Sequence, residues 1–107
     1  GLQSIAFDPN FGTNQYVYLY FTYRGTTNNG SPINTNSYNT IWRYTANGDV
    51  VEPGSGVEIL NLGYLSSAGN HNGGGLVFGT DGMLYIATGE NANTSLSQNT
   101  NSLYGKI

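Results

Sequence analysis

The sequence predicts an all-β chain, and three observations lead to this prediction. Apolar residues alternate with polar ones or occur in short runs. Aromatic and β-branched residues dominate these runs, and clusters of Gly, Asn and Pro end each of them. The apolar share of 37% and the aromatic share of 13% argue for a packed chain, although only 8% of the residues are charged.

Four strands are predicted in the first part of the chain, and each ends at turn-forming residues. In order they are LQSIAF (2–7), YVYLYFTY (16–23), TIWRYT (40–45) and VEILNL (57–62). In the second strand, alternation places Val17, Leu19 and Phe21 on one face and tyrosine or threonine on the other. Both faces are therefore semi-apolar, which is typical of a sheet stacked between two neighbours.

Three further strands are predicted in the second part. They are GLVF (75–78), MLYIAT (83–88) and LYGKI (103–107). The Thr-Asp-Gly turn between the first two indicates a tight hairpin. A long stretch rich in Asn and Ser separates the second from the third.

An internal repeat relates the two parts. IAFDPNFGTNQYVYLYFT is similar to LVFGTDGMLYIATG, so that Ile5 matches Leu76 and Phe7 matches Phe78. The repeat unit is about 70 residues and holds four strands, a pattern typical of β-propeller blades. The alternative is a small β-sandwich with a chance repeat.

The repeat predicts a β-propeller fragment of about one and a half four-stranded antiparallel blades. Residues 1–62 form one blade, residues 63–74 an inter-blade loop, and residues 75–107 most of the next blade. A propeller closes with roughly 4–8 blades. We therefore expect the remaining blades of a longer parent, or other copies of the chain, as partners. A start at Gly1 and an end on LYGKI agree with this expectation.

The connections fall into two classes. One edge of the predicted blades collects the compact turns DPNFGTNQ, ANGD and TDG. The other edge collects long polar loops at 24–39, 63–74 and 90–102. Function resides more often on long loops, and the only histidine, His71, lies on that side.

His71 and Glu90 are the candidate catalytic residues. His71 precedes one strand of the predicted hairpin and Glu90 follows the other, so both lie at the same end. A carboxylate that holds one imidazole nitrogen fixes the tautomer and raises the basicity of the other, which suits proton abstraction. The glycines at 73–75 would let a flat cofactor or substrate approach. The alternative is a solvated loop histidine and an unpaired surface glutamate.

Composition excludes several other functions. The net charge is −3 and the three cations are scattered, so nucleic-acid binding is not expected. The chain has no cysteine, and no apolar run approaches the roughly 20 residues of a membrane span. The segment TGENAN has one carboxylate, whereas calcium sites use several, so no metal site is predicted. A polar composition with few charges favours a periplasmic or secreted location.

Three motifs resemble one known family. GLQSIAFDPNFGTNQYVYLYFTY, NHNGGGLVFGTDGMLYIATGEN and NSLYGKI are similar, in this order, to segments of the glucose/sorbosone dehydrogenase family. Its members include six-bladed β-propeller sugar dehydrogenases that use pyrroloquinoline quinone (PQQ) and calcium. The resemblance covers nearly the whole chain.

The resemblance implies a reaction. His71 would contact PQQ and act as general base on the anomeric hydroxyl of an aldose, which is oxidised to a lactone. Glu90, at a position that is commonly aspartate, would orient His71. Most residues that hold PQQ and calcium in the family would lie outside this chain, so the chain alone is expected to be inactive.

The chain departs from the family pattern at several positions, and a second function remains open. Gly75 stands where many members have arginine, and Gln3-Ser4 replaces Leu-Gly. The family also includes propellers without demonstrated redox activity. The alternative function is therefore a non-catalytic binding module for a sugar or a protein. Lys106 and Trp42 are interpreted as structural, and the glycosylation sequons at Asn29 and Asn93 as chance matches.

Overall fold

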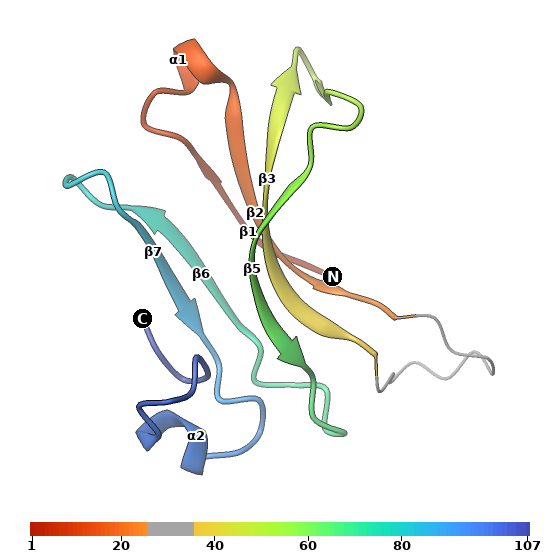
Figure 1. The fold of residues 1–107 in the computed structure, drawn as a ribbon, viewed down its shortest axis with the longest axis vertical. Coiled ribbons are helices and arrows are strands. Elements are labelled where there is room, and N and C mark those ends of the chain that lie inside the picture. The colour runs from red at the N-terminus through yellow and green to blue at the C-terminus, as the bar shows by residue number, and fades with distance from the viewer. Residues whose placement is uncertain (26–35) are drawn as a thin grey trace.

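The computed structural model describes residues 1–25 and 36–107, which form two antiparallel sheets (Figure 1). The strands of the first sheet are β1 (Leu2–Phe7), β2 (Tyr16–Tyr23), β3 (Tyr38–Asn47), β4 (Val50–Val51) and β5 (Val57–Tyr64). β2 lies between β1 and β3, and the other edge of β3 pairs with both β4 and β5. A hairpin of β6 (Gly73–Phe78) and β7 (Leu84–Thr88) forms the second sheet.

The all-β prediction is confirmed, and six of the predicted strands agree with the structure to within two residues at either end. Their pairing is antiparallel throughout. The two-residue strand β4 pairs with the far end of β3; the sequence predicts a strand in the stretch VVEPGSGVEILNL, but mainly at 57–62. Short-range alternation and turn residues therefore suffice to locate these strands.

The predicted strand at 103–107 is wrong. Two residues of this segment bond to Thr88 at the end of β7. The Lys106 carbonyl accepts from the Thr88 amide at 2.9 Å and its amide donates to Thr88 Oγ1 at 3.0 Å, while the Leu103 carbonyl accepts from Thr88 Oγ1 at 2.6 Å. Gly105 has a φ of 65°, a left-handed conformation that turns the backbone out of the extended path. The segment is therefore a turn that bonds to Thr88, the last residue of β7.

Two short helices occupy stretches for which only turns and loops were predicted. They are α1 (Phe11–Asn14) and α2 (Ser95–Gln98), each of four residues and so about one turn long. In α1 the Phe11 amide donates to the Asp8 carbonyl at 2.9 Å, and Gln15 ends the turn with a φ of 58°. No described helix exceeds one turn, as the blade assignment requires.

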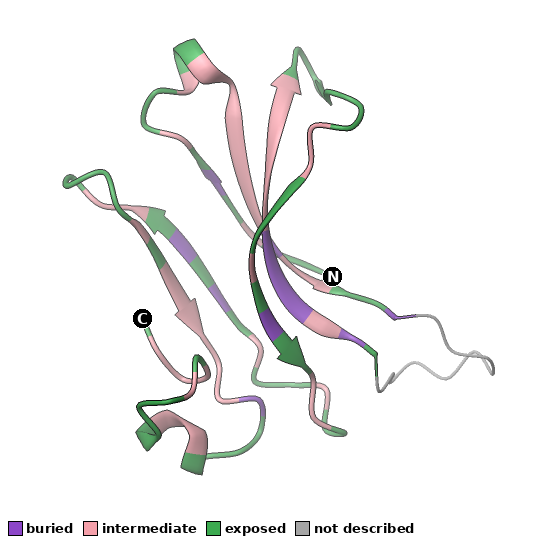
Figure 2. Cartoon of the chain, in the orientation of Figure 1, coloured by how far each residue is buried: buried purple, intermediate pink, exposed green. Residues whose placement is uncertain are grey.

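The core lies between the first sheet and the hairpin (Figure 2). The tyrosine face of the first sheet, the side that carries Tyr18 and Tyr20, packs against β6 and β7. The Tyr18 ring meets the Phe78 ring edge-on at 5.2 Å between centroids. Tyr20 and Ile41 are fully buried. Tyrosine suits this face because its ring packs while its hydroxyl can reach polar groups at the rim.

The opposite, valine face, with Val17, Leu19 and Phe21, remains open. It is hollowed by two depressions of about 240 and 370 Å³. The repeat explains this asymmetry: Leu76 is 9% exposed because the first sheet covers it, whereas its counterpart Ile5 is 51% exposed. The predicted sheet with two semi-apolar faces is therefore observed, and one of them has no neighbour within the described residues.

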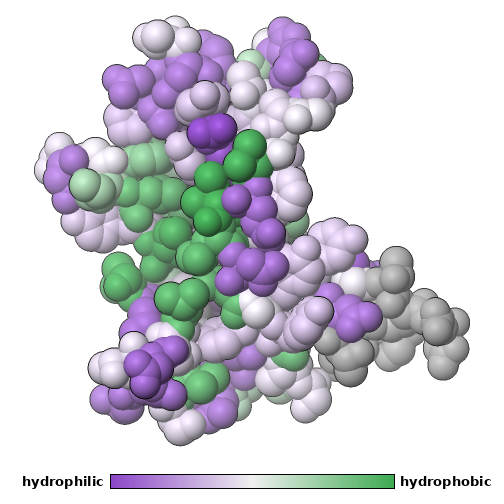
Figure 3. Space-filling view, in the orientation of Figure 1, coloured by the Kyte–Doolittle hydropathy of each residue, from purple (hydrophilic) through white to green (hydrophobic). Residues whose placement is uncertain are grey.

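A second apolar surface lies between β5 and β7 (Figure 3). The hollow here measures about 250 Å³, and Leu60, Leu62, Leu84 and Ile86 contribute to its lining. An apolar hollow that opens on the surface is typical of places that contact further protein.

The two classes of connection lie at opposite ends of the strands (Figure 1). α1, the β3–β4 turn and the β6–β7 turn lie at one end. The loop from β5 to β6 and the segment containing α2 lie at the other. The predicted separation of short turns from long loops is therefore confirmed for the described residues, and His71 is at the loop-rich end. The division into a blade at 1–62, an inter-blade loop at 63–74 and a second blade at 75–107 remains a prediction. In the structure β5 ends at 64 and β6 begins at 73.

Candidate active site

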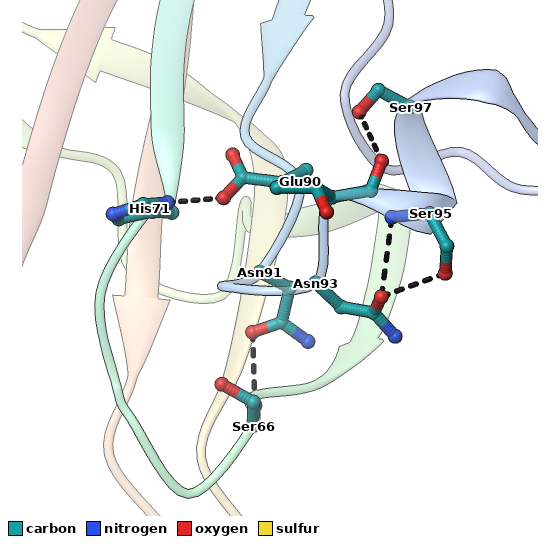
Figure 4. A network of polar contacts seen from close by, with 8 residues as sticks. Ser66, His71, Glu90, Asn91, Asn93, Ser95 and Ser97 are labelled. Atoms are coloured by element: carbon teal, nitrogen blue, oxygen red, sulfur yellow. Dashed lines mark hydrogen bonds and ion pairs between the residues drawn. The ribbon is translucent and has the colours of Figure 1, made fainter.

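His71 and Glu90 meet at the loop-rich end of the hairpin (Figure 4). In the β6–β7 register, Gly73 is opposite Thr88, so His71, two positions before β6, and Glu90, two positions after β7, are brought to the same end of the hairpin. The Nδ1 atom of His71 is hydrogen-bonded to Oε1 of Glu90. The structure thus brings together the two side chains that the sequence singled out.

The pairing engages Nδ1 of the imidazole and not its second nitrogen, Nε2. The His71 side chain is 55% exposed and the Glu90 side chain 21%. Because the carboxylate accepts from Nδ1–H, the lone pair of the neutral ring is on Nε2, which points away from Glu90 in Figure 4. This arrangement can accept a proton from a hydroxyl group placed beside Nε2.

The pairing with His71 changes the pKa of the Glu90 carboxyl group. The hydrogen bond from His71, followed by backbone N–H groups including that of Ala92, lowers the pKa of Glu90 below its ordinary value of 4.5. A carboxylate that is easier to ionise stays charged over a wider pH range. Glu90 is therefore a stable acceptor for the imidazole N–H.

We expect the carboxyl group of Glu90 to titrate below pH 4.5 in the folded protein. Because the folded pKa is depressed, the pair stabilises the fold fully above the unfolded pKa, and this stabilisation is lost as the pH falls through the folded pKa. Carbon-13 NMR of the glutamate carboxyl groups measures this value. In a His71→Ala variant the same signal is expected to titrate closer to 4.5; an unchanged midpoint would contradict the pairing.

The backbone segments that carry the pair are in direct contact. The Asn91 amide donates to the His71 carbonyl at 3.2 Å. A Cβ at Gly89 would overlap the His71 carbonyl, and one at Gly73 would overlap the backbone of Thr88 and Gly89. We expected glycine at 73–75 to admit a flat ligand; at Gly73 the structure shows a different reason, namely the close approach of two backbones.

The residue after His71 is held by the first sheet. The hydroxyl of Tyr20 donates to the Asn72 carbonyl at 2.6 Å, and Asn39 Nδ2 donates to Asn72 Oδ1 at 3.0 Å. Burial, with a smaller effect of Tyr104, raises the pKa of Tyr20 to about 12, so its hydroxyl remains a donor. The sequence does not single out these residues, because a tyrosine in an alternating strand is indistinguishable from a packing residue.

Glu90 is braced from the other side by the C-terminal segment. The Gly105 amide donates to the Gly89 carbonyl at 2.9 Å. Lys106 Nζ donates to the carbonyls of Leu96, Ser97 and Tyr104 at 2.8–2.9 Å. Lys106 is therefore structural, as predicted, and it ties the end of α2 to the strand that leads to Glu90.

Asn91 joins the site to the preceding loop. It is 7% exposed, its Oδ1 accepts from the Ser66 amide at 2.8 Å, and its Nδ2 donates to the Tyr64 carbonyl at 3.2 Å (Figure 4). The turn after Glu90 is thereby attached to the end of β5. The carboxylate and the imidazole consequently rest on a common frame.

The remaining candidates contribute little to the site. Asn93 is exposed and its Oδ1 accepts from Ser95 Oγ at 2.7 Å, while Asn29 lies outside the described residues. Trp42 stacks on Tyr44 with 5.9 Å between ring centroids, in agreement with a packing role. Within residues 1–25 and 36–107, no group of three acidic or histidine side chains is close enough to hold a metal ion. None of the described helices is long and apolar enough to cross a membrane.

Comparisons with known proteins agree with the motifs. The glucose/sorbosone dehydrogenase family profile matches residues 1–107. The structure is similar to that of the PQQ-bound aldose sugar dehydrogenase of Streptomyces coelicolor, with 34% identity and a TM-score of 0.75. It is also similar to that of a putative oxidoreductase, described as a glucose dehydrogenase, of Thermus thermophilus, with 34% identity and a TM-score of 0.77. Each match covers 100% of this chain and 29% of the other.

The soluble aldose sugar dehydrogenase of Escherichia coli, solved in its apo-form, is a further similar structure. It is 27% identical, with a TM-score of 0.74, and the match covers 98% of this chain and 28% of that one. The chain therefore spans less than a third of the length of these proteins.

Proposed function

Because the chain belongs to the glucose/sorbosone dehydrogenase family and its sheets match part of a propeller-fold dehydrogenase, we propose that it forms part of a PQQ-dependent sugar dehydrogenase. In this proposal His71 is the general base that removes the proton of the anomeric hydroxyl of an aldose. The observation that carries it is the exposed imidazole whose Nδ1 is held by Glu90, at the loop-rich end of the blades.

The residues of this chain provide the proton-transfer half of the reaction. Nε2 takes the proton of the hydroxyl on C1 while the C1–H bond breaks and a C=O bond forms, which yields a lactone. The departing hydride carries two electrons, and bound PQQ would supply their acceptor. As the imidazole becomes positively charged, the Glu90 carboxylate beside Nδ1 stabilises that charge.

His71 fits a place beside the cofactor, but two of the three cations of the chain, Lys106 and Arg43, are engaged within the described residues and are not available for the anionic groups of PQQ. The His71 side chain is 55% exposed, and its Nε2 points away from Glu90. Lys106 is occupied by three carbonyl groups, and the Arg43 guanidinium lies over the Tyr16 ring, 4.1 Å from its centroid. Groups that bind the carboxylates of PQQ would therefore come from the rest of the protein, as would the ligands of the calcium ion that we also propose.

Reconstitution of the full-length protein tests this function. We expect the protein to bind PQQ in the presence of calcium and then to reduce an electron-accepting dye when an aldose is added. The 107-residue chain alone is expected to bind no PQQ and to show no activity. Failure of the full-length protein to bind PQQ, together with binding of a sugar or protein ligand, would favour a binding module instead.

A further inference from the structure

Two buried polar side chains of the first sheet reach the loop that carries His71. Tyr20, in β2, is 0% exposed, and Asn39, in β3, is 2% exposed. Their hydrogen bonds both end on Asn72, one on its carbonyl and one on its side-chain oxygen. The residue adjacent to the candidate base is thus attached to a part of the chain more than 30 positions away in sequence.

These bonds belong to a row of donors and acceptors that crosses the interface between the two sheets. Thr22 Oγ1 donates to Asn39 Oδ1 at 2.8 Å, Asn39 donates to Asn72, and Asn72 Nδ2 donates to the Gly69 carbonyl at 3.3 Å. Asparagine is disfavoured within strands, and a buried amide destabilises a fold unless it is paired. An apolar side chain would pack at position 39 but would not bind the loop.

The backbone at His71 is consequently fixed on both sides. Its own carbonyl accepts from Asn91, and the carbonyl of the next residue accepts from Tyr20. Between these two anchors His71 has a φ of 57°, so the direction of its Cα–Cβ bond is set by the anchors and not by a regular strand. The ring then meets Glu90 through Nδ1.

We propose that Tyr20 and Asn39 are positioning residues, which act through Asn72 to hold His71 in its Nδ1–H form against Glu90. Their importance for sugar oxidation rests on the proposed function. The position and the tautomer of His71 depend, in this proposal, only on residues of this chain. Both are measurable without the cofactor.

The ring nitrogens of His71 report this hold directly. Nitrogen-15 NMR of the full-length protein distinguishes the protonated from the unprotonated ring nitrogen, and the His71 signals are those that a His71→Gln variant loses. In the unmodified protein at neutral pH we expect Nδ1 to carry the proton. In Tyr20→Phe, which removes one oxygen and no carbon, we expect a shift towards the Nε2–H form that free histidine favours. We also expect kcat to fall by about tenfold with an unchanged KM for the sugar, because a displaced base loses alignment.

Two further variants complete the experiment. Tyr18→Phe is the matched control: this tyrosine is on the same strand and face, but its hydroxyl donates to Asp8 at the opposite end, so the His71 signals should not change. Asn39→Leu removes the other anchor with the same number of side-chain heavy atoms and should change the tautomer as Tyr20→Phe does. Folded Tyr20→Phe and Asn39→Leu proteins that keep the Nδ1–H form would overturn the inference. A tautomer change in a protein that oxidises no sugar would support the positioning role and reject the proposed function.

Discussion

Replacement of His71 by alanine is expected to reduce kcat for aldose oxidation by about 10²–10⁴-fold in the PQQ-loaded full-length protein. The reason is that His71 is the only histidine of the chain, its side chain is 55% exposed, and the carboxylate beside it, that of Glu90, is bound to its Nδ1. Binding of the cofactor and the sugar should change much less than the rate. Dye-coupled kinetics at saturating PQQ and sugar measure this loss.

Two companion variants make the result specific. Glu90→Gln keeps the shape of the acceptor but presents an amide to Nδ1, so it should also lower kcat, by a smaller factor. Ser67→Ala, in the same loop and exposed, should leave kcat unchanged. Activity of His71→Ala close to that of the unmodified protein would exclude His71 as the base.

Replacement of Gly89 by alanine is expected to destabilise the fold by about 3 kcal/mol and to abolish activity. The added Cβ would occupy the position of the His71 carbonyl oxygen and would lie 2.7 Å from the Gly73 amide nitrogen. Both contacts are with backbone, which cannot move aside as a flexible side chain can. The two segments that carry the site would have to separate. Urea denaturation gives the free energy of unfolding, and the nitrogen-15 signals of His71 show whether the pair survives.

Gly12→Ala is the matched control for this substitution. Gly12 lies in α1, a Cβ added there would meet no other part of the chain within 4 Å, and the position does not require a left-handed backbone. Alanine there should be neutral or stabilise the protein by up to about 1 kcal/mol. Equal effects of the two alanine substitutions would show that the contact between the two segments contributes nothing.

The strands could be predicted because their signal is local. YVYLYFTY alternates tyrosine and apolar residues from Tyr16 to Phe21, and β2 has the predicted limits. The meeting of His71 and Glu90 was also predictable, since a tight turn fixes the register of the hairpin between them. In both cases a few neighbouring residues determine the outcome.

The features that the sequence did not predict depend on contacts between residues that are distant in the chain. The stretch LYGKI has strand composition, but Gly105 turns the backbone and Lys106 is attached to α2, which alternation does not reveal. The anchoring of Asn72 by Tyr20 and Asn39 joins a loop to two strands that are distant in sequence, so no local pattern indicates it. Geometry between the two sheets, and not composition, makes these residues important.

The left-handed backbone of the site has an evolutionary consequence. Of the four non-glycine residues with positive φ in the described parts of the chain, three are His71, Asn91 and Ala92. A side chain in this conformation costs roughly 1 kcal/mol, which glycine avoids. Selection for thermal tolerance alone would therefore favour glycine at positions 71 and 92. A histidine at such a position persists only where an advantage of its imidazole outweighs the lost stability, so in this region selection for heat resistance and selection for chemistry act in opposite directions.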